Sequence, residues 1–597
     1  MTSFPQRTVT CGELRGSHDQ AGVVLNGWVD VVRDHGGLLF LDLRDRYGIT
    51  QVVIDPEQVS AELLGVAREV RPEYVLAVSG VVQRRPEEAI NRERPTGEVE
   101  VAVQGLQILN ASKTPPFVLS DDVQVSDELR FKYRYLDLRR PALRQALEVR
   151  HRFFLALRRA LSARDYLEVE TPLLTRLTPE GSREYVVPSR VHPGKFYALP
   201  QSPQVFKQLI MIGGLDRYFQ IARCLRDEDL RADRQPEFTQ LDLELSFGNE
   251  QDVQAIIEDV LQEAIRDTFG RELETPFPRL AYQDALDRFG LDKPDLRFGL
   301  EIIDLAAVLG GAGFRVVDGA LEAGGLCRGL RVEGGAERLS RKEIDALTAF
   351  VADFGAKGLA FLKADEKGQL AGPLARWVDE ERRQALEQTC GFTRGDLLLV
   401  VAAEAAVVHR SLGELRNELA RRLELIPADS RLNFVWITDF PMFEWNPEEG
   451  RFTTSHHPFT MPLEAAPGQL ESDPGRVRAR AYDLVLNGWE LGSGSVRIHR
   501  RELQQRVFES LGIAAEEAQE KFGFFLEAFE FGAPPHAGIA LGLERLLALL
   551  LGKRNIRDLV AFPKTTSASC LMTGAPTEVT DQTLVELSLE RRREPER

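Results

Sequence analysis

Residues 217–245 (RYFQIARCLRDEDLRADRQPEFTQLDLEL) constrain the fold more than any other part of this 597-residue chain. In their second half, Leu241, Leu243 and Leu245 alternate with polar residues, and this period of two predicts a half-buried strand. The first half alternates in the same way, and charged residues fill the loop between the two. The stretch therefore predicts a β-hairpin that carries acids, a guanidinium and an aromatic ring on one polar face.

Arg226, Glu228 and Phe238 lie at the open end of this polar face. A guanidinium can grip a phosphate or carboxylate at two points, and the Phe238 ring offers a flat surface to a base. From alternation alone, an exposed hairpin with a salt-bridged tip fits equally well. The string RDEDLRADRQPEFTQLD, however, closely resembles motif 2 of class II aminoacyl-tRNA synthetases, in the form found in bacterial aspartyl enzymes.

Charge and cysteine content narrow the class of protein further. The chain has 75 basic and 92 acidic residues, a net charge of −17, which argues against a generic nucleic-acid binder but leaves room for local tRNA-binding patches. Its five cysteines are scattered without a C-x-x-C pair, so neither a disulfide framework nor a zinc site is indicated. With no signal-peptide pattern and no apolar run of about 18 residues, we expect a soluble cytoplasmic protein without a membrane partner.

The first 110 residues predict a small β-barrel. Candidate strands cover residues 23–32, 38–43, 50–54, 74–82 and 99–108, with a helix at 57–69. Five strands with a helix between the third and fourth is the order of an OB barrel. By spacing alone, Phe40 could simply belong to the barrel core. The run RDHGGLLFLDLRDRYG resembles the anticodon-binding face of bacterial aspartyl enzymes, which implies anticodon contacts from Arg33, His35, Phe40 and Gln51.

The whole chain predicts an α+β multidomain protein. An N-terminal OB-fold barrel precedes a class II catalytic domain on an antiparallel sheet, which is interrupted by an inserted α/β domain rich in glycine and alanine. We expect these boundaries: barrel 1–110, hinge 111–140, catalytic domain 141–296 and 426–562, insertion 297–425, and C-terminal extension 563–597. The insertion resembles one found in bacterial aspartyl enzymes.

The segment DYLEVETPLLT begins at Asp165 and resembles motif 1, the dimer-interface element of class II enzymes. The resemblance implies a homodimer. One departure is Asp165 itself, which stands where the family usually has glycine.

A pocket for the amino acid is implied by three further segments. TPEGSREYVVP resembles the loop that closes over bound aspartate, and LPQSPQVFKQLI places Gln204 and Lys207 on one face of a helical turn. Lys207 and Arg497 are both cations, which argues for a substrate with a carboxylate side chain. TTSHHPFTMP holds adjacent histidines, which point oppositely on a strand and do not suit a shared metal. The aspartate contacts implied by the resemblance are Glu180, Gln204, Lys207, Arg226, Asp242, His456 and Arg497.

A nucleotide subsite is implied by the last third of the chain. Asp483 and Glu490 flank a tight Asn487-Gly488 turn and suit a Mg²⁺ shared with ATP phosphates, although a structural network of charged residues is the alternative. GIALGLERLLALLL resembles motif 3, with Glu544 in place of the usual aspartate, and FPKTTSASCLMTGAP also matches the family closely. The implied ATP contacts are Arg226, Asp227, Glu228, Gln235, Phe238, Glu490, Gly542, Leu543, Glu544 and Arg545.

Together these resemblances imply an aspartate–tRNA ligase that uses ATP and Mg²⁺, with Arg226, Glu228 and Arg545 as catalytic residues. L-aspartate would form an adenylate, which is then transferred to the 3′ end of tRNA(Asp). His35 resembles the residue of relatives that charge both tRNAs, so we also expect some charging of tRNA(Asn). The alternatives are an asparaginyl or lysyl sister enzyme, a non-catalytic RNA-binding paralogue, and a structural adaptor.

Overall fold

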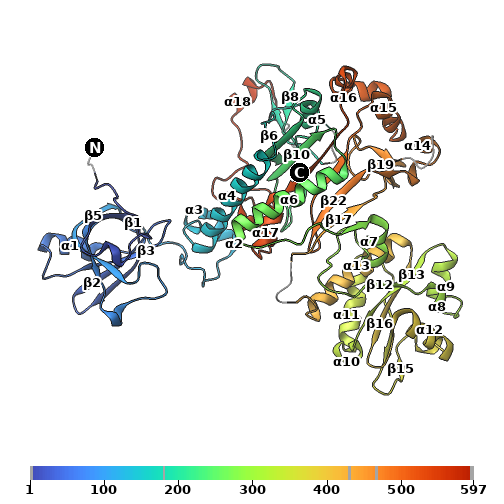
Figure 1. The fold of residues 1–597 in the computed structure, drawn as a ribbon, viewed down its shortest axis with the longest axis horizontal. Coiled ribbons are helices and arrows are strands. Elements are labelled where there is room, and N and C mark those ends of the chain that lie inside the picture. Colours follow the sequence, from blue (N-terminus) through green and yellow to red (C-terminus); the bar gives the residue numbers. More distant parts are fainter. Residues whose placement is uncertain (1–3, 179–181, 428–431, 464–467, 592–597) are drawn as a thin grey trace. The chain divides into compact units, whose positions relative to one another are not determined.

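The computed structural model describes residues 4–178, 182–427, 432–463 and 468–591 (Figure 1). The chain divides into two compact units, residues 1–146 with 571–573, and residues 147–570 with 574–597. None of the helices in the described ranges is both long enough and apolar enough to cross a membrane.

The first unit contains a closed five-stranded barrel. Its strands are β1 (Gly22–His35), β2 (Leu38–Arg44), β3 (Ile49–Ile54), β4 (Val75–Arg84) and β5 (Val99–Asn110), in the order β1-β2-β3-β5-β4. Helix α1 (Ala61–Glu69) lies between β3 and β4 in the chain. The predicted OB barrel is confirmed. Helices α2 (Asp127–Lys132) and α3 (Arg134–Asp137) follow, and α4 (Pro141–Ser162) then runs on into the second unit.

The second unit is organised around an eight-stranded sheet of order β11-β17-β22-β23-β24-β10-β9-β6. The sheet is antiparallel except for the edge pairs β11–β17 and β6–β9. Its strands are β6 (Leu167–Glu168), β9 (Arg217–Leu225), β10 (Glu237–Ser246), β11 (Arg279–Ala281), β17 (Phe434–Thr438), β22 (Ala481–Leu486), β23 (Trp489–Val496) and β24 (His536–Gly542). The helices that position the site are α5 (Gln204–Ile212), α6 (Glu250–Phe269), α7 (Tyr282–Phe289) and α17 (Leu543–Leu550).

The predicted hairpin is β9 and β10, but the prediction of a half-buried strand is wrong. In β10, Leu243 and its polar neighbours Asp242 and Glu244 are all fully buried. The reason is the position of the strand, since β10 lies between β9 and β24 inside the sheet. Its polar face is covered by charged partners rather than by water, and such a face keeps the same alternation as an exposed one.

The part of the chain that follows α7 and precedes β17 forms a second sheet, as the predicted α/β insertion requires. It has the order β12-β13-β16-β14-β15 and contains β12 (Ile302–Asp304), β13 (Leu326–Val332), β14 (Ala360–Ala364), β15 (Leu370–Ala371) and β16 (Leu397–Ala403). Alternate residues of β16 enter two different apolar clusters, which explains the continuous apolar run LLLVV in the sequence. The exact domain boundaries stay a prediction.

Two local backbone features bear on the sequence analysis. Asp165 has φ of 61°, in the left-handed region that glycine enters freely and aspartate tolerates, so this departure from the family keeps the backbone conformation. Asn487 and Gly488 have φ of 52° and 83° and connect β22 to β23 as the tight turn that was expected.

Candidate active site

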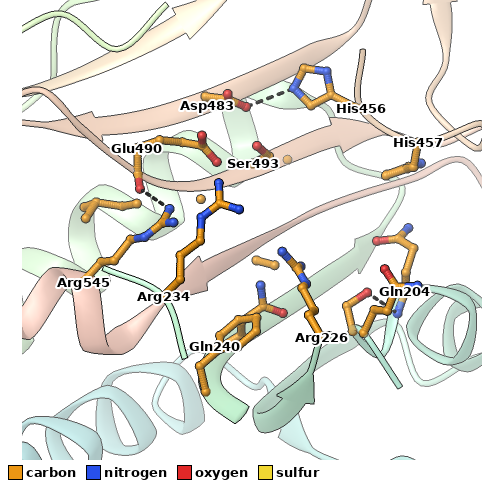
Figure 2. Close-up of a pocket in the computed structure, with 18 of the residues that line it drawn as sticks. Gln204, Arg226, Arg234, Gln240, His456, His457, Asp483, Glu490, Ser493 and Arg545 are labelled. Carbon is orange, nitrogen blue, oxygen red and sulfur yellow. Dashed lines mark hydrogen bonds and ion pairs between the residues drawn. The ribbon is translucent and has the colours of Figure 1, made fainter. Parts of the chain in front are cut away.

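A cavity of about 390 Å³ opens over the polar face of the eight-stranded sheet. Side chains from β10, β23 and β24 line it, together with the β9–β10 loop and the starts of α5 and α17 (Figure 2). The predicted site residues among its lining are Gln204, Arg226, Glu228, Gln235, Phe238, His456, Asp483, Glu490, Arg497, Gly542, Glu544 and Arg545. The fold thus brings together residues from segments more than 300 positions apart.

Arg226 and Phe238 form one wall of the cavity. The Arg226 guanidinium carbon lies 5.0 Å from the centre of the Phe238 ring, a cation–π contact, and Nε of Arg226 is buried with no hydrogen-bond partner among the described residues. The Arg226 backbone N–H donates to the Pro236 carbonyl at 2.9 Å. Because β9 ends at Leu225, Arg226 lies in the loop and its position depends on contacts across that loop.

The remaining residues of this loop differ in their exposure to the cavity. Glu228 accepts a hydrogen bond from Arg234 at 2.9 Å, and both line the cavity. Asp227 does not line it, and its backbone N–H donates to the Arg183 carbonyl instead. The structure therefore places Asp227 outside the cavity lining, held by a backbone contact with Arg183.

Four buried charges form a cluster, here called the floor cluster: Lys207, Asp242, Glu244 and Arg497. Arg497 lines the cavity, whereas Lys207, Asp242 and Glu244 are not part of its lining. Nζ of Lys207 lies 3.1 Å from Oδ1 of Asp242 and 3.5 Å from Oε2 of Glu244. Arg497 grips Glu244 at two points, with Nε donating at 2.9 Å and Nη2 at 3.1 Å. Two cations and two carboxylates balance within the cluster.

The two carboxyls of the floor cluster shift in opposite directions. Burial raises the pKa of both, but for Glu244 the nearby Arg497 and Lys207 outweigh burial and its pKa is lowered. Asp242 has Lys207 as its main partner, burial outweighs it, and its pKa is raised. Oδ2 of Asp242 is buried without a hydrogen-bond partner among the described residues. Asp242 and Glu244 therefore pair with Lys207 and Arg497 inside the protein, so the two cations are compensated by the chain itself.

His456 and His457 line the same cavity but have different partners. Nε2 of His456 lies 3.0 Å from Oδ1 of Asp483, and although burial opposes its protonation, Asp483 outweighs burial and the pKa of His456 is raised. Nη1 of Arg497 donates to Nε2 of His457 at 2.6 Å, and burial together with Arg497 lowers the pKa of His457 well below its usual value. His457 is thus a neutral acceptor in the floor.

Asp483 and Glu490, here called the acid pair, line the same cavity, with Asp483 beside His456 and Glu490 beside Arg545 (Figure 2). Burial and repulsion from Asp483 raise the pKa of Glu490, against attraction from Arg545. Arg545 donates to the main-chain carbonyl of Glu490 at 3.1 Å, and not to its carboxylate. Two carboxylates that repel each other fit a divalent cation that also binds phosphate oxygens. In the described ranges, no group of three or more His, Cys, Asp or Glu side chains is arranged to hold a metal ion.

Several predicted ATP contacts have their polar atoms engaged by the protein. Glu544 accepts from Arg150 at 2.8 Å and from the Thr239 N–H at 2.9 Å, so it fastens α17 to β10 and α4. Gln235 is engaged through both atoms of its amide by the backbone of Lys564. Leu543 is fully buried and does not line the cavity.

The cavity also contains polar residues that the sequence analysis did not assign to it. Gln201, Ser202, Gln240, Ser493 and His457 all line it. The strand alternation carried a signal for Gln240, which shares parity with Phe238 and Asp242. Ser493 lies inside β23 and shares parity with Arg497, so alternation carried a signal for it as well. Gln201, Ser202 and His457 lie in loops, where alternation says nothing about direction.

Two groups of predicted residues lie elsewhere. Glu180 falls outside the described residues. In the barrel, Arg33 pairs with Asp42 at 2.8 Å and donates to Gln51 at 3.0 Å, while the exposed His35 ring lies 6.1 Å from that of Phe40 in an edge-on contact. Phe40 is half-buried, so it is not part of the barrel core. These four residues form one continuous surface on β1, β2 and β3.

Two family models match the chain. One, described as tRNA synthetases class II (D, K and N), matches residues 126–566, and the other, described as OB-fold nucleic acid binding domain, matches residues 23–109. Among solved structures, asparaginyl-tRNA synthetase from Pyrococcus horikoshii complexed with asparaginyl-adenylate is similar with a TM-score of 0.59 at 20% identity, covering 94% of this chain and 99% of that one. At that identity the likeness establishes the fold alone.

Curated relatives are much more similar in sequence. An aspartate–tRNA(Asp/Asn) ligase of Geobacillus sp. (strain WCH70) is 54% identical over 583 residues, which is 98% of each chain. An aspartate–tRNA ligase of Geobacillus kaustophilus (strain HTA426) is 52% identical over 584 residues, again 98% of each. An aspartate–tRNA(Asp/Asn) ligase of Desulfatibacillum aliphaticivorans is 51% identical over 590 residues, 99% of this chain and 98% of its own.

Proposed function

Because the chain belongs to the class II tRNA synthetases (D, K and N), we propose that it is an aspartate–tRNA ligase. In the first step, the α-carboxylate of aspartate attacks the α-phosphorus of ATP. A carboxylate oxygen–phosphorus bond forms, the bond to the β-phosphate breaks, and pyrophosphate leaves. In the second step, a hydroxyl of the terminal tRNA adenosine attacks the activated carbonyl and releases AMP.

The observation that carries this proposal is the Arg226 guanidinium in the cavity wall. It stacks on Phe238, and its Nε is buried without a partner among the described residues, a state that a phosphate or carboxylate oxygen would relieve. Arg226 would bridge the aspartate carboxylate and the α-phosphate, while Phe238 and Arg545 hold the adenine between them. Glu228 would fix the ATP through the Arg234 pair.

The side chain of aspartate would lie over the floor cluster. Lys207 and Arg497 provide its cations, and Asp242 and Gln204 each have a buried polar atom without a partner among the described residues. These atoms suit the α-amino group and the substrate carboxylate respectively, with Glu180 and His456 as further contacts. Since Asp242 and Glu244 already neutralise the cations, selectivity would rest on how the cluster relaxes around the ligand rather than on a free positive charge.

The acid pair would hold Mg²⁺, with Asp483 and Glu490 as its protein ligands. When bound, the ion would neutralise charge on the ATP phosphates and the leaving pyrophosphate. His456 would orient Asp483 through its 3.0 Å hydrogen bond, and Arg545 would hold the Glu490 backbone at 3.1 Å.

The barrel would read the tRNA anticodon through Arg33, His35, Phe40 and Gln51. The relatives are named either aspartate–tRNA ligase or aspartate–tRNA(Asp/Asn) ligase, and His35 supports the second name, so we propose some charging of tRNA(Asn) as well. Such an enzyme works on cytoplasmic tRNA, and we place it there.

We propose a homodimer through the segment of residues 166–174, which contains β6 at the edge of the sheet. Three apolar side chains of this segment, Leu167, Leu173 and Leu174, each have about half of their surface exposed. Exposed apolar surface of this kind can mark a protein interface. A monomeric mass in solution at micromolar concentration would contradict the dimer.

Amino-acid-dependent pyrophosphate–ATP exchange tests the function directly. Exchange should require aspartate, and asparagine and lysine should support it far less. Arg226→Ala should lower exchange by about 10²–10³, the usual effect of removing one preorganised charge contact, with the fold intact. Exchange with asparagine or lysine alone would point to a sister enzyme, and no exchange with any of the three to a binding protein.

A further inference from the structure

Residues 562–576 (FPKTTSASCLMTGAP) match the family closely, yet the function proposed above gives them no role. Their third residue, Lys564, contacts the β9–β10 hairpin across 329 positions of sequence.

Lys564 holds the returning arm of the hairpin at three points. Its backbone N–H donates to Oε1 of Gln235 at 2.8 Å, and its carbonyl accepts from Nε2 of Gln235 at 3.2 Å. Its Nζ donates to Oε1 of Glu237 at 2.8 Å. Gln235 is 3% exposed, so its amide is held in one orientation away from solvent.

The residue between the two that are held is Pro236, whose carbonyl accepts the backbone N–H of Arg226 at 2.9 Å. The residue after them is Phe238, on which the Arg226 guanidinium stacks. Lys564 therefore holds the residues on both sides of Pro236, and the Pro236 carbonyl in turn holds the backbone of Arg226. Arg226 lies beyond the end of β9, so this contact replaces the strand pairing that it lacks.

The same part of the chain holds the preceding residues of the loop. The Ile556 N–H donates to the Ala232 carbonyl at 3.2 Å, and Arg545 pairs with Asp233 at 3.2 Å. The segment from Arg545 to Lys564 thus follows the returning arm from residue 232 to residue 237.

We propose that Lys564 is a positioning residue for the nucleotide subsite. Through Gln235 and Glu237 it sets the Pro236 carbonyl, and through that carbonyl it sets Arg226 and Phe238. Gln235 acts in the same way, as a positioning residue whose amide is turned toward Lys564. This inference rests on the proposed function, because it assigns Arg226 and Phe238 to ATP.

The first test compares Lys564→Met with Arg223→Met. Both cations bind Glu237, Arg223 at 2.9 Å, but Arg223 lies on β9, and its other hydrogen bond goes to Thr239. Lys564→Met should raise the KM for ATP in pyrophosphate exchange by about three- to tenfold, the range expected for one charge-assisted hydrogen bond. The KM for aspartate should change less, since the floor cluster is untouched, and Arg223→Met should leave both constants close to those of the unchanged protein.

Two further variants separate positioning from simple structural support. Gln235→Glu removes the amide N–H that donates to the Lys564 carbonyl. This variant should raise the KM for ATP, and its melting temperature should stay near that of Lys564→Met. The exchange of charges in Lys564→Glu with Glu237→Lys should recover part of the affinity for ATP lost in Lys564→Glu. A KM for ATP that is the same in Lys564→Met and Arg223→Met would overturn the proposal. Parallel loss of stability and activity without any recovery in the charge exchange would also overturn it.

ATP titration calorimetry makes this test independent of the reaction. If the unchanged protein exchanges no pyrophosphate with aspartate, the proposed function fails. Weaker ATP binding by Lys564→Met than by Arg223→Met would still support the positioning role, and equal binding would contradict it.

Discussion

The floor cluster and the acid pair are two charged regions at one cavity, and they are built in opposite ways. In the floor cluster, Lys207 and Arg497 are buried against Asp242 and Glu244, and each cation has a carboxylate within 3.1 Å. In the acid pair, Asp483 and Glu490 repel each other, and the pKa of Glu490 is raised by burial and by that repulsion. The floor cluster balances its charges with the protein's own side chains, whereas the acid pair has negative charge that a bound cation would balance.

This difference indicates which substitutions should lower the stability of the protein and which should lower its activity. Removing one partner of a buried ion pair destabilises the fold because the other charge is left buried and uncompensated, whereas two like charges held close together cost stability until a cation binds. We therefore expect substitutions in the floor cluster to appear first in unfolding experiments, and substitutions in the acid pair to appear first in kinetics.

The largest effect is expected from Glu244→Gln. It leaves Arg497 and Lys207 buried with one carboxylate fewer, and breaking such a pair typically costs about 3–5 kcal/mol of unfolding free energy. Urea unfolding would measure it. Glu301→Gln is the matched control, since Glu301 pairs with Arg288 at 2.6 Å with both side chains about half exposed, and its loss should cost under about 1 kcal/mol. Equal shifts in the two variants would contradict the comparison.

Glu490→Gln should lower activity rather than stability, the reverse of Glu244→Gln. The ligand-free protein should become no less stable, because the variant removes a carboxylate whose pKa is raised by burial and by Asp483. Pyrophosphate exchange should fall by about 10²–10³, as for other charge contacts at a reacting phosphate. A destabilised Glu490→Gln protein with near-normal exchange and an unchanged Mg²⁺ requirement would assign Glu490 to the structural network instead.

The floor cluster also predicts a dependence of stability on pH through His457. Its pKa is depressed by burial and by the facing charges of Arg497, His456 and Lys207. The unfolded chain takes up a proton near pH 6.5 and the folded chain does not, so stability is complete above that pH and falls as the pH decreases toward the folded pKa. One proton corresponds to about 1.4 kcal/mol per pH unit.

His457→Gln should flatten this part of the pH profile, measured as unfolding free energy at pH 7.5 and 5.5. His192→Gln is the control, because His192 is exposed. If His192→Gln flattened the profile as much as His457→Gln, the floor cluster would not be the source of the acid sensitivity.

The smallest effect is expected in the barrel, where paired and exposed groups again lie side by side. Arg33 is fixed by Asp42 and Gln51, whereas His35 is exposed at the end of β1 and contacts the edge of Phe40. His35→Leu should raise the ratio of tRNA(Asp) to tRNA(Asn) charging by about two- to fivefold, less than a full base mismatch. Equal charging ratios for both proteins would remove His35 from the discrimination.

Much of the fold follows from local patterns. The alternation in β9 and β10, the order of five short strands around one helix, and the Asn487-Gly488 turn are each encoded within about a dozen residues. The same holds for Gln204 and Lys207, which share a face because α5 begins at Gln204. These features could be predicted because they depend on neighbours in the sequence.

The pairings in and around the cavity could not be predicted in this way. Lys207 meets Asp242 across 35 positions, Arg497 meets Glu244 across 253, and Gln235 meets Lys564 across 329. Alternation identified Asp242 and Glu244 as polar-face residues, but it cannot tell a solvated face from one covered by buried partners. For that reason the burial of β10 and the compensation of Lys207 and Arg497 were both missed.

The sequence by itself determined which residue types stand on which strand face, and through the resemblance of its motifs it determined the family. Only the tertiary structure decided which charges neutralise each other and which remain for a ligand. The physical reason is that the direction of a side chain is set by local backbone geometry, whereas the electrostatic state of a buried group depends on every charge packed around it. In this protein those charges come from segments hundreds of residues apart.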